Sequence, residues 1–224
     1  MLSVRDLIEN VFDTLRKQGL LENTFVIFTS DNGFHLGEHR LHAGKLTPYE
    51  EDIRVPLFIR GPGVLAGQDR EEIVGNIDLA PTIAELAGAR VPDFVDGRSL
   101  VPLLIGGARP QRWREAFLVE QEEMHFNQGQ PKREVLEPQD LFEQQMVAAR
   151  QGIPSYAALR TATHAYVIYG TGERELYDLR ADPYELNNIV TTADRNLVNR
   201  LDKWLAEFRK CKGAGCREID VGPR

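Results

Sequence analysis

The sequence contains no long hydrophobic run. Its apolar stretches are no longer than about five or six residues, for example around residues 25–28 and 55–59, whereas a membrane-spanning helix needs about 20. We therefore expect no membrane span. Residues 1–20 also differ from a secretory signal peptide, because charged side chains occur throughout them and no apolar core is present.

A surplus of positive charge is missing as well. The 27 Lys and Arg residues are outnumbered by 34 Asp and Glu residues, which gives a net charge of −7. Nucleic-acid-binding proteins usually carry a basic surplus, so we expect no nucleic-acid partner. With 224 residues, of which 42% are hydrophobic and 27% charged, the composition is typical of a globular chain of one large or two small domains.

Cysteine is scarce, since the chain has only Cys211 and Cys216. Four residues, Lys-Gly-Ala-Gly, separate them, and this small and flexible spacer lets the two thiols meet. The spacing predicts a short disulfide loop and therefore an oxidising compartment. A pair of exposed free thiols near the C-terminus is the alternative.

The first part of the chain follows the order of an α/β fold. Apolar residues recur at helical spacing from Val4 to Leu15, and Gly19 stands where such a helix would end. Residues 25–29 are apolar without alternation, which predicts a strand buried on both faces, as in a parallel sheet. Residues 55–59 predict a second strand, and the proline at its second position indicates a strand start or a sheet edge.

A helix and a change in composition follow these strands. Asp78 is placed to cap a helix that ends at Gly88. Together these elements predict an α/β sheet within residues 1–108. We expect residues 109–155 to form a polar insertion or linker, because six glutamines and five glutamates fall between positions 121 and 145.

Residues 156–224 have a different pattern. Short alternating runs at 158–163, 166–169 and 175–179, with a Gly-Thr-Gly turn between the last two, predict an antiparallel meander. Apolar residues at helical spacing from 197 to 208 predict one helix that packs on this sheet. We therefore expect a small C-terminal α+β subdomain.

Two hard oxygen donors follow the first predicted strand. Asp31 and Asn32 come directly after residues 25–29, and in α/β sheets ligands bind beyond the carboxyl ends of strands. A carboxylate and an amide oxygen suit Ca²⁺ or Mg²⁺. An ordinary Asp-Asn-Gly turn is the alternative.

The loop after Asp31 and Asn32 is strongly basic. Residues 35–45 contain three histidines, one arginine and one lysine against a single acid, Glu38, which favours an anionic group such as sulfate or phosphate. Two alternatives remain. His35, His39 and His42 could bind zinc, or the loop could simply be solvated.

Several motifs in fixed order resemble the C-terminal half of the sulfatase catalytic domain, most closely the N-acetylglucosamine-6-sulfatase and related glycan-sulfatase branch. The most specific are TSDNGFHLGEH at 29–39 and GKLTPYEEDIRVPL at 44–57. The resemblance covers most of residues 20–108 and 156–210. The further motifs are NIDLAPT at 76–82, DGRSL at 96–100, ERELYDL at 173–179 and DPYELNN at 182–188.

The resemblance implies a fold, a cofactor and residue roles. The fold would be the last part of an alkaline-phosphatase-like α/β core, followed by a small antiparallel sheet with one packed helix. Asp31 and Asn32 would be ligands of an active-site Ca²⁺, and Lys45 would be a catalytic contact to the sulfate. His35 and His39 would be candidate substrate contacts.

The family nucleophile is missing from this sequence. Sulfatases use a formylglycine made within a Cys/Ser-x-Pro/Ala-x-Arg motif. Cys211, Cys216 and Ser155 are the nearest matches, and none of them has the arginine. We therefore expect a C-terminal fragment of a sulfuric ester hydrolase that is inactive without the N-terminal half of the enzyme.

The resemblance also sets the expected substrate, partners and location. The substrate would be a sulfated sugar or glycan, and the location would be extracytoplasmic, that is, secreted, periplasmic or lysosomal. A non-catalytic module that binds sulfated glycans is one alternative. A phosphoester hydrolase of the same superfamily is another, although Asn32 beside Asp31 favours a sulfatase, since many phosphoester relatives have a histidine there.

Overall fold

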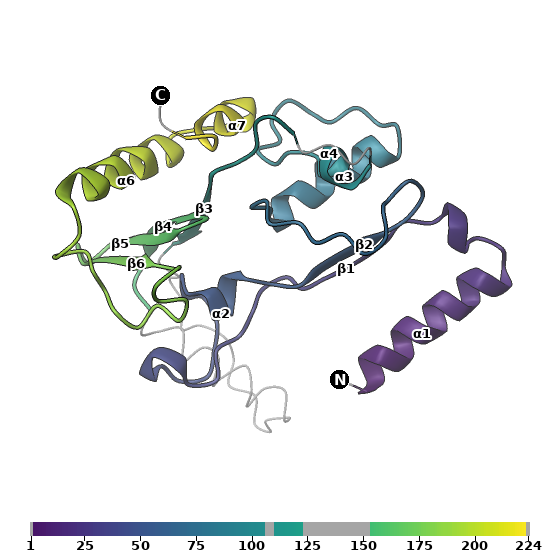
Figure 1. Cartoon of the computed structure of the whole chain (residues 1–224), viewed down its shortest axis with the longest axis horizontal. Coiled ribbons are helices and arrows are strands. Elements are labelled where there is room, and N and C mark those ends of the chain that lie inside the picture. Colours follow the sequence, from purple (N-terminus) through teal and green to yellow (C-terminus); the bar gives the residue numbers. More distant parts are fainter. Residues whose placement is uncertain (1, 106–109, 123–152, 223–224) are drawn as a thin grey trace, which may run out of the picture.

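The structure is a computed structural model that describes residues 2–105, 110–122 and 153–222. It confirms the mixed α/β class, with a two-stranded and a four-stranded sheet, both antiparallel (Figure 1). The α-helices of the described part are α1 (Leu2–Lys17), α2 (Glu50–Ile53), α3 (Leu79–Leu86), α4 (Val101–Leu104), α6 (Arg195–Phe208) and α7 (Cys216–Ile219). The strands are β1 (Val26–Thr29), β2 (Leu57–Arg60), β3 (Ala116–Gln121), β4 (Tyr156–Thr161), β5 (His164–Tyr169) and β6 (Arg174–Asp178).

The four-stranded sheet confirms the predicted meander. Its strand order is β3-β4-β5-β6, and Leu159 faces Leu118 on one side and Tyr166 on the other. Strand β3 lies inside the segment 109–155, so an edge strand of this sheet comes from the region expected to be an insertion or linker. Residues 123–152, which include most of the glutamine-rich stretch, lie outside the described residues.

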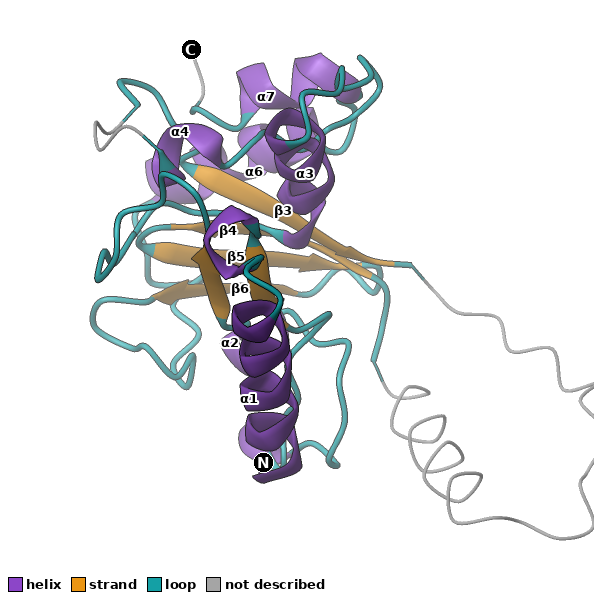
Figure 2. Cartoon of the chain, turned by 90° about the vertical axis from the view of Figure 1, so that its right-hand side faces the viewer, coloured by secondary structure: helices purple, strands orange, loops and turns teal. Residues whose placement is uncertain are grey.

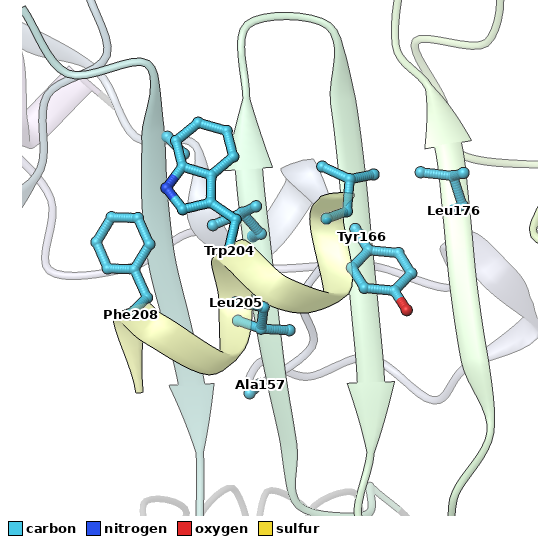
Figure 3. Packing of buried hydrophobic residues seen from close by; sticks show 9 residues of the cluster. Ala157, Tyr166, Leu176, Trp204, Leu205 and Phe208 are labelled. Carbon is cyan, nitrogen blue, oxygen red and sulfur yellow. The ribbon is translucent and has the colours of Figure 1, made fainter. Parts of the chain in front are cut away.

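Helix α6 covers one face of this sheet, as the apolar spacing predicted (Figure 3). Its buried side chains pack on alternate residues of the strands, and α6 and α7 lie above the sheet in both overall views (Figures 1 and 2). The indole nitrogen of Trp204 also donates a hydrogen bond to the carbonyl of Ile219, 2.8 Å away. The core consists of Ala116, Ala157, Leu159, Tyr166, Leu176, Leu201, Trp204, Leu205 and Phe208.

The two-stranded sheet corrects one expectation. Strands β1 and β2 exist where the sequence placed them, but β1 pairs only with β2 among the described residues, and the pairing is antiparallel. Phe28 is 38% exposed and Phe58 is 67% exposed. The prediction of a parallel strand buried on both faces was therefore wrong for the described structure. An apolar run indicates that a strand needs cover, but it does not determine the direction of the neighbouring strand.

Helix α1 agrees with its prediction and ends near Gly19, whose φ of 67° suits glycine. None of its residues is buried, and Leu2 and Leu7 are 71% and 63% exposed. Figure 1 shows α1 at the far end of the molecule from the four-stranded sheet. None of the helices in the described part has the length and hydrophobicity of a membrane span.

Asp78 stands at the predicted start of helix α3, but its side chain does not cap that helix. Its carboxylate is fully buried and forms a two-fold ion pair with Arg114, at 2.5 and 2.8 Å. Arg114 also contacts Asp220 at 3.1 Å. Burial opposes the charge of Arg114, but its hydrogen bonds to Asp78 and Asp220 raise its pKa above the ordinary value.

Cys211 and Cys216 form a disulfide between α6 and α7. The enclosed loop contacts a distant segment, because the amide of Gly213 donates to the carboxylate of Asp96. Arg217 donates to the carbonyl oxygens of Val95 and Gly97, at 2.6 and 3.1 Å. The bridge therefore holds the C-terminal end against residues 95–97.

Arg114→Met should destabilise the chain by about 3–5 kcal/mol, because it leaves the buried carboxylate of Asp78 without a counter-charge and removes one of the two arginine partners of Asp220. Urea unfolding followed by tryptophan fluorescence would measure the change. Arg209→Met is the matched control. It removes an exposed ion pair to Glu120 at 3.2 Å, which should cost at most about 1 kcal/mol. Equal losses in the two variants would contradict this prediction.

The exposed faces of β1 and β2 should make the isolated chain self-associate, because open strand edges and exposed aromatic rings lie together there. Phe58→Ser should weaken that association. Phe94→Ser is the control, since Phe94 is 80% exposed but outside the sheet. Sedimentation velocity at several concentrations would measure it, and a monomeric wild-type chain would refute the prediction.

Candidate active site

The turn after β1 is held against helix α2. The amide of Gly33 donates to the carbonyl of Asp52 at 2.8 Å. A Cβ atom at position 33 would lie 1.9 Å from the carbonyl oxygen of Glu51, so only glycine permits this approach. From the other side, the Asn76 amide donates to the carbonyl of Asp31 at 2.9 Å. The position of Asp31 and Asn32 is therefore fixed through the backbone.

Asp31, Asn32 and Lys45 come together at this turn. The Lys45 ammonium donates to Oδ1 of Asn32 at 3.0 Å, although the two residues are 13 positions apart. Asp31 is exposed, and its Oδ1 accepts the Asn32 amide at 3.0 Å. Two hard oxygen donors and one cation thus occupy one accessible place, as expected for a site that holds a hard metal ion and an anion.

His35 lies elsewhere, in the interior. It is 2% exposed, and its Nδ1 contacts the two carboxylate oxygens of Asp52 at 2.9 and 3.1 Å. Its Nε2 contacts the carbonyl of His42 at 2.9 Å. Each ring nitrogen therefore faces an oxygen atom of the protein. His35 is thus fully engaged within the protein in this structure.

Asp52 connects both ends of the basic loop. In addition to His35, its carboxylate accepts the amide and the hydroxyl of Thr47, each at 2.7 Å. The backbones of His35 and Gly44 are joined by two hydrogen bonds of 3.0 and 2.9 Å. Lys45 lies between Gly44 and Thr47, so these contacts hold the backbone on both sides of it.

His39 occupies a third location. Its ring stacks on Tyr49 with a centroid separation of 3.7 Å and an interplanar angle of 11°. Its Nε2 lies 3.4 Å from a carboxylate oxygen of Glu51. The three loop histidines therefore do not form the shared zinc site that their spacing allowed: among the described residues, only His39 belongs to a potential metal-binding group.

Glu185 and Glu51 are the other two members of this potential metal-binding group. Glu185 was not among the site residues expected from the sequence. It is 2% exposed and accepts the Glu50 amide at 2.8 Å. Burial, together with the nearby charges of Glu50 and Glu51, raises its pKa to about 7. Its motif at 182–188 was the only available signal, and that motif also has a purely structural explanation.

Further contacts join α2 to the four-stranded sheet. Glu50 forms a two-fold ion pair with Arg160, at 2.6 and 3.1 Å. The Tyr49 hydroxyl donates to Glu175 at 3.2 Å, and burial raises the pKa of Tyr49 to about 12. The basic loop is therefore attached through α2 to the C-terminal subdomain.

The donor set at Asp31 and Asn32 fits Ca²⁺ by its chemistry. Both side chains offer oxygen atoms, and Asp31 is open to solvent. Ca²⁺ usually takes six to eight oxygen ligands, so these two residues would supply only part of its coordination shell. The fold and the site together define a class of protein. It is an α/β protein in which oxygen donors and a lysine lie just beyond the end of a strand.

Comparison with known proteins identifies the family within this class. Residues 1–89 match the sulfatase family. The chain is 37% identical over 230 residues to N-acetylglucosamine-6-sulfatase of Bos taurus. This alignment covers 99% of the chain and 41% of the bovine protein. The first part of the chain is therefore similar to the sulfatase family, and the chain spans about two fifths of the length of the first curated relatives it matches.

Solved structures agree with this assignment. A protein in complex with its substrate D-glucosamine-2-N,6-O-disulfate is 31% identical, with a TM-score of 0.76, over 98% of this chain and 40% of that chain. The phosphonate monoester hydrolase of Agrobacterium radiobacter is 30% identical, with a TM-score of 0.69, over 88% of this chain and 37% of that chain. The fold is that of the C-terminal part of an alkaline-phosphatase-like sulfatase.

The raised pKa of Glu185 predicts a pH dependence of stability. On folding, the pKa of this carboxyl group rises from 4.5 to about 7. Its contribution to folding stability is fully present below about pH 4.5 and is lost as the pH rises to about 7. Glu185→Gln cannot ionise and should lose that part of the slope. Tryptophan-monitored urea unfolding in chelator-containing buffers from pH 4.5 to 7.5 would measure it.

Glu9→Gln serves as the control for this measurement. Glu9 lies on α1 with an exposed side chain, so its substitution should leave the pH dependence unchanged. Identical slopes in wild-type chain and Glu185→Gln would contradict the prediction.

Proposed function

We propose that the chain forms part of the active site of a sulfuric ester hydrolase that acts on a sulfated sugar or glycan. The observation that carries this proposal is the placement of Lys45, whose ammonium lies 3.0 Å from Asn32 beside the exposed carboxylate of Asp31. The match of residues 1–89 to the sulfatase family supports the reaction class. Relatives named N-acetylglucosamine-6-sulfatase and the solved complex with a disulfated glucosamine support a sugar substrate.

Each residue of the site has a role in this proposal. Asp31 and Asn32 would hold Ca²⁺, which neutralises negative charge on the sulfate oxygens when bound. Lys45 would bind a sulfate oxygen and stabilise the charge that develops during ester cleavage. Asp52 and His35 would keep the loop in place around Lys45. The formylglycine nucleophile would come from a part of the enzyme outside this sequence.

His39 has a weaker case as a substrate contact. Its side chain is 9% exposed, and its ring stacks on Tyr49. We therefore assign direct sulfate contact to Lys45 and not to His39 or to the enclosed His35.

An extracytoplasmic location belongs to the same proposal. The disulfide between Cys211 and Cys216 would persist in an oxidising compartment. Relatives in Drosophila melanogaster and Caenorhabditis elegans carry the name extracellular sulfatase, which supports this location.

Lys45→Ala should lower kcat/KM for an aryl sulfate by about 10²–10³-fold in the complete enzyme, because a cation aimed at the reacting sulfate is lost. Lys203→Ala, an exposed position on α6, is the control and should have no effect. The isolated chain should show negligible turnover. Sulfatase activity of the purified chain that survives Lys45→Ala would overturn the proposed role.

A phosphoester or phosphonate hydrolase is the second candidate, because the Agrobacterium radiobacter relative is a phosphonate monoester hydrolase. Parallel assays of the complete enzyme on aryl sulfate, aryl phosphate and aryl phosphonate would separate the two. Preference for sulfate supports the first proposal. Retention of the chain on a sulfated-sugar column without any hydrolysis by the complete enzyme would favour a binding module.

A further inference from the structure

A second group of ligand-type side chains lies outside the set formed by Asp31, Asn32 and Lys45. His39, Glu51 and Glu185 each place one ligand atom within 4.8 Å of the other two. His39 of the basic loop and Glu51 of helix α2 are 12 positions apart, whereas Glu185 comes from the distant segment after β6. Folding therefore brings them together.

The spacing of His39 and Glu51 suits a shared metal ion. Their nearest atoms, Nε2 and Oε2, are 3.4 Å apart, which exceeds the usual N–H···O range of about 2.7–3.2 Å. Two ligands at about 2.0–2.1 Å from a tetrahedral zinc ion are themselves about 3.4 Å apart. The observed separation therefore matches one edge of such a site, and the stacked Tyr49 ring fixes the orientation of the imidazole.

The charges of the group also call for a cation. Glu185 is 2% exposed, and buried carboxylates are normally paired with a positive group. Its hydrogen bond comes from the neutral Glu50 amide. Arg160, the nearby guanidinium, is bonded to Glu50. Among the described residues, no lysine or arginine forms an ion pair with Glu51 or Glu185, so two carboxylates share one imidazole.

We propose that His39, Glu51 and Glu185 bind a divalent transition metal ion, with zinc as the preferred candidate. One imidazole and two carboxylates are a donor set that zinc uses, whereas Ca²⁺ prefers oxygen alone. Three protein ligands leave one position for water. Because the ligands belong to the loop, to α2 and to the segment after β6, the ion cross-links the loop that carries Lys45 to the C-terminal subdomain.

Equilibrium dialysis of the 224-residue chain against Zn²⁺ tests the proposal. Mass spectrometry would count the bound metal per chain, so the result does not depend on whether the chain self-associates. We expect one zinc per chain. His39→Gln, Glu51→Gln and Glu185→Gln should each raise the dissociation constant at least about tenfold. Replacement of zinc by Co²⁺ should give the visible absorption of tetrahedral cobalt(II), and the three variants should lose it.

Two control variants separate this site from other binding. Asp31→Asn removes a proposed Ca²⁺ ligand, and Glu9→Gln removes an exposed carboxylate on α1; both should retain zinc. Trp204 fluorescence reports whether each variant keeps the folded core. Absence of stoichiometric zinc, zinc retained by folded His39→Gln and Glu51→Gln chains, or zinc lost in Asp31→Asn would overturn the proposal. Because Asp31→Asn addresses the other site, the sulfatase proposal succeeds or fails separately.

Discussion

The ion pairs of Arg114 join three parts of the chain that are distant in sequence. Its guanidinium contacts Asp78 at the start of α3 and Asp220 after α7, and the residue itself lies two positions before the start of strand β3. Arg98 adds a second contact to Asp220 and, through its backbone amide, a bond of 2.9 Å to Asp78. Asp78, Arg114 and Asp220 are buried. Their ion pairs hold the helical region around α3 and α4 against the sheet and helix of the C-terminal part. The relative placement of the two halves depends on this charge network as well as on apolar packing.

Asp52 has a comparable function at the basic loop. Its backbone carbonyl holds Gly33, and its carboxylate holds His35 and Thr47. Asp31 and Asn32 are next to the first of these contacts, and Lys45 lies between the other two. The buried Asp52 thus contacts the chain on both sides of the proposed active site. Glu50, in the same short helix, forms an ion pair with Arg160 of β4. Of the site residues themselves, Asp31 is exposed, and Asn32 and Lys45 are partly buried.

The sequence predicted the local elements more completely than their partners. Helices α1 and α6 and the meander β4–β6 were predictable because periodicity, glycine turns and apolar alternation act over a few residues. The antiparallel pairing of β1 could not be read from its apolar run, since direction depends on a neighbour elsewhere in the chain. Asp78 looked like a helix cap because only its local position was visible, whereas its partner Arg114 is 36 residues away. For the same reason the sequence placed Asp31, Asn32 and Lys45 in one site but offered no sign that His35 would be enclosed by Asp52 or that Glu185 would meet His39.

The close contact at Gly33 has a consequence for how substitutions spread through this region. A Cβ atom there would lie 1.9 Å from the Glu51 carbonyl, so even a methyl group would force the turn away from α2. The displaced atoms would include the oxygen donors of the two preceding residues, although neither would have been changed. Side-chain repacking could not relieve this clash, because the atom that the Cβ would meet belongs to the backbone of Glu51 and not to a flexible side chain. Exchange of this glycine for alanine would thus move the side-chain oxygens of Asp31 and Asn32 away from Lys45 while leaving the distant helix–sheet core intact.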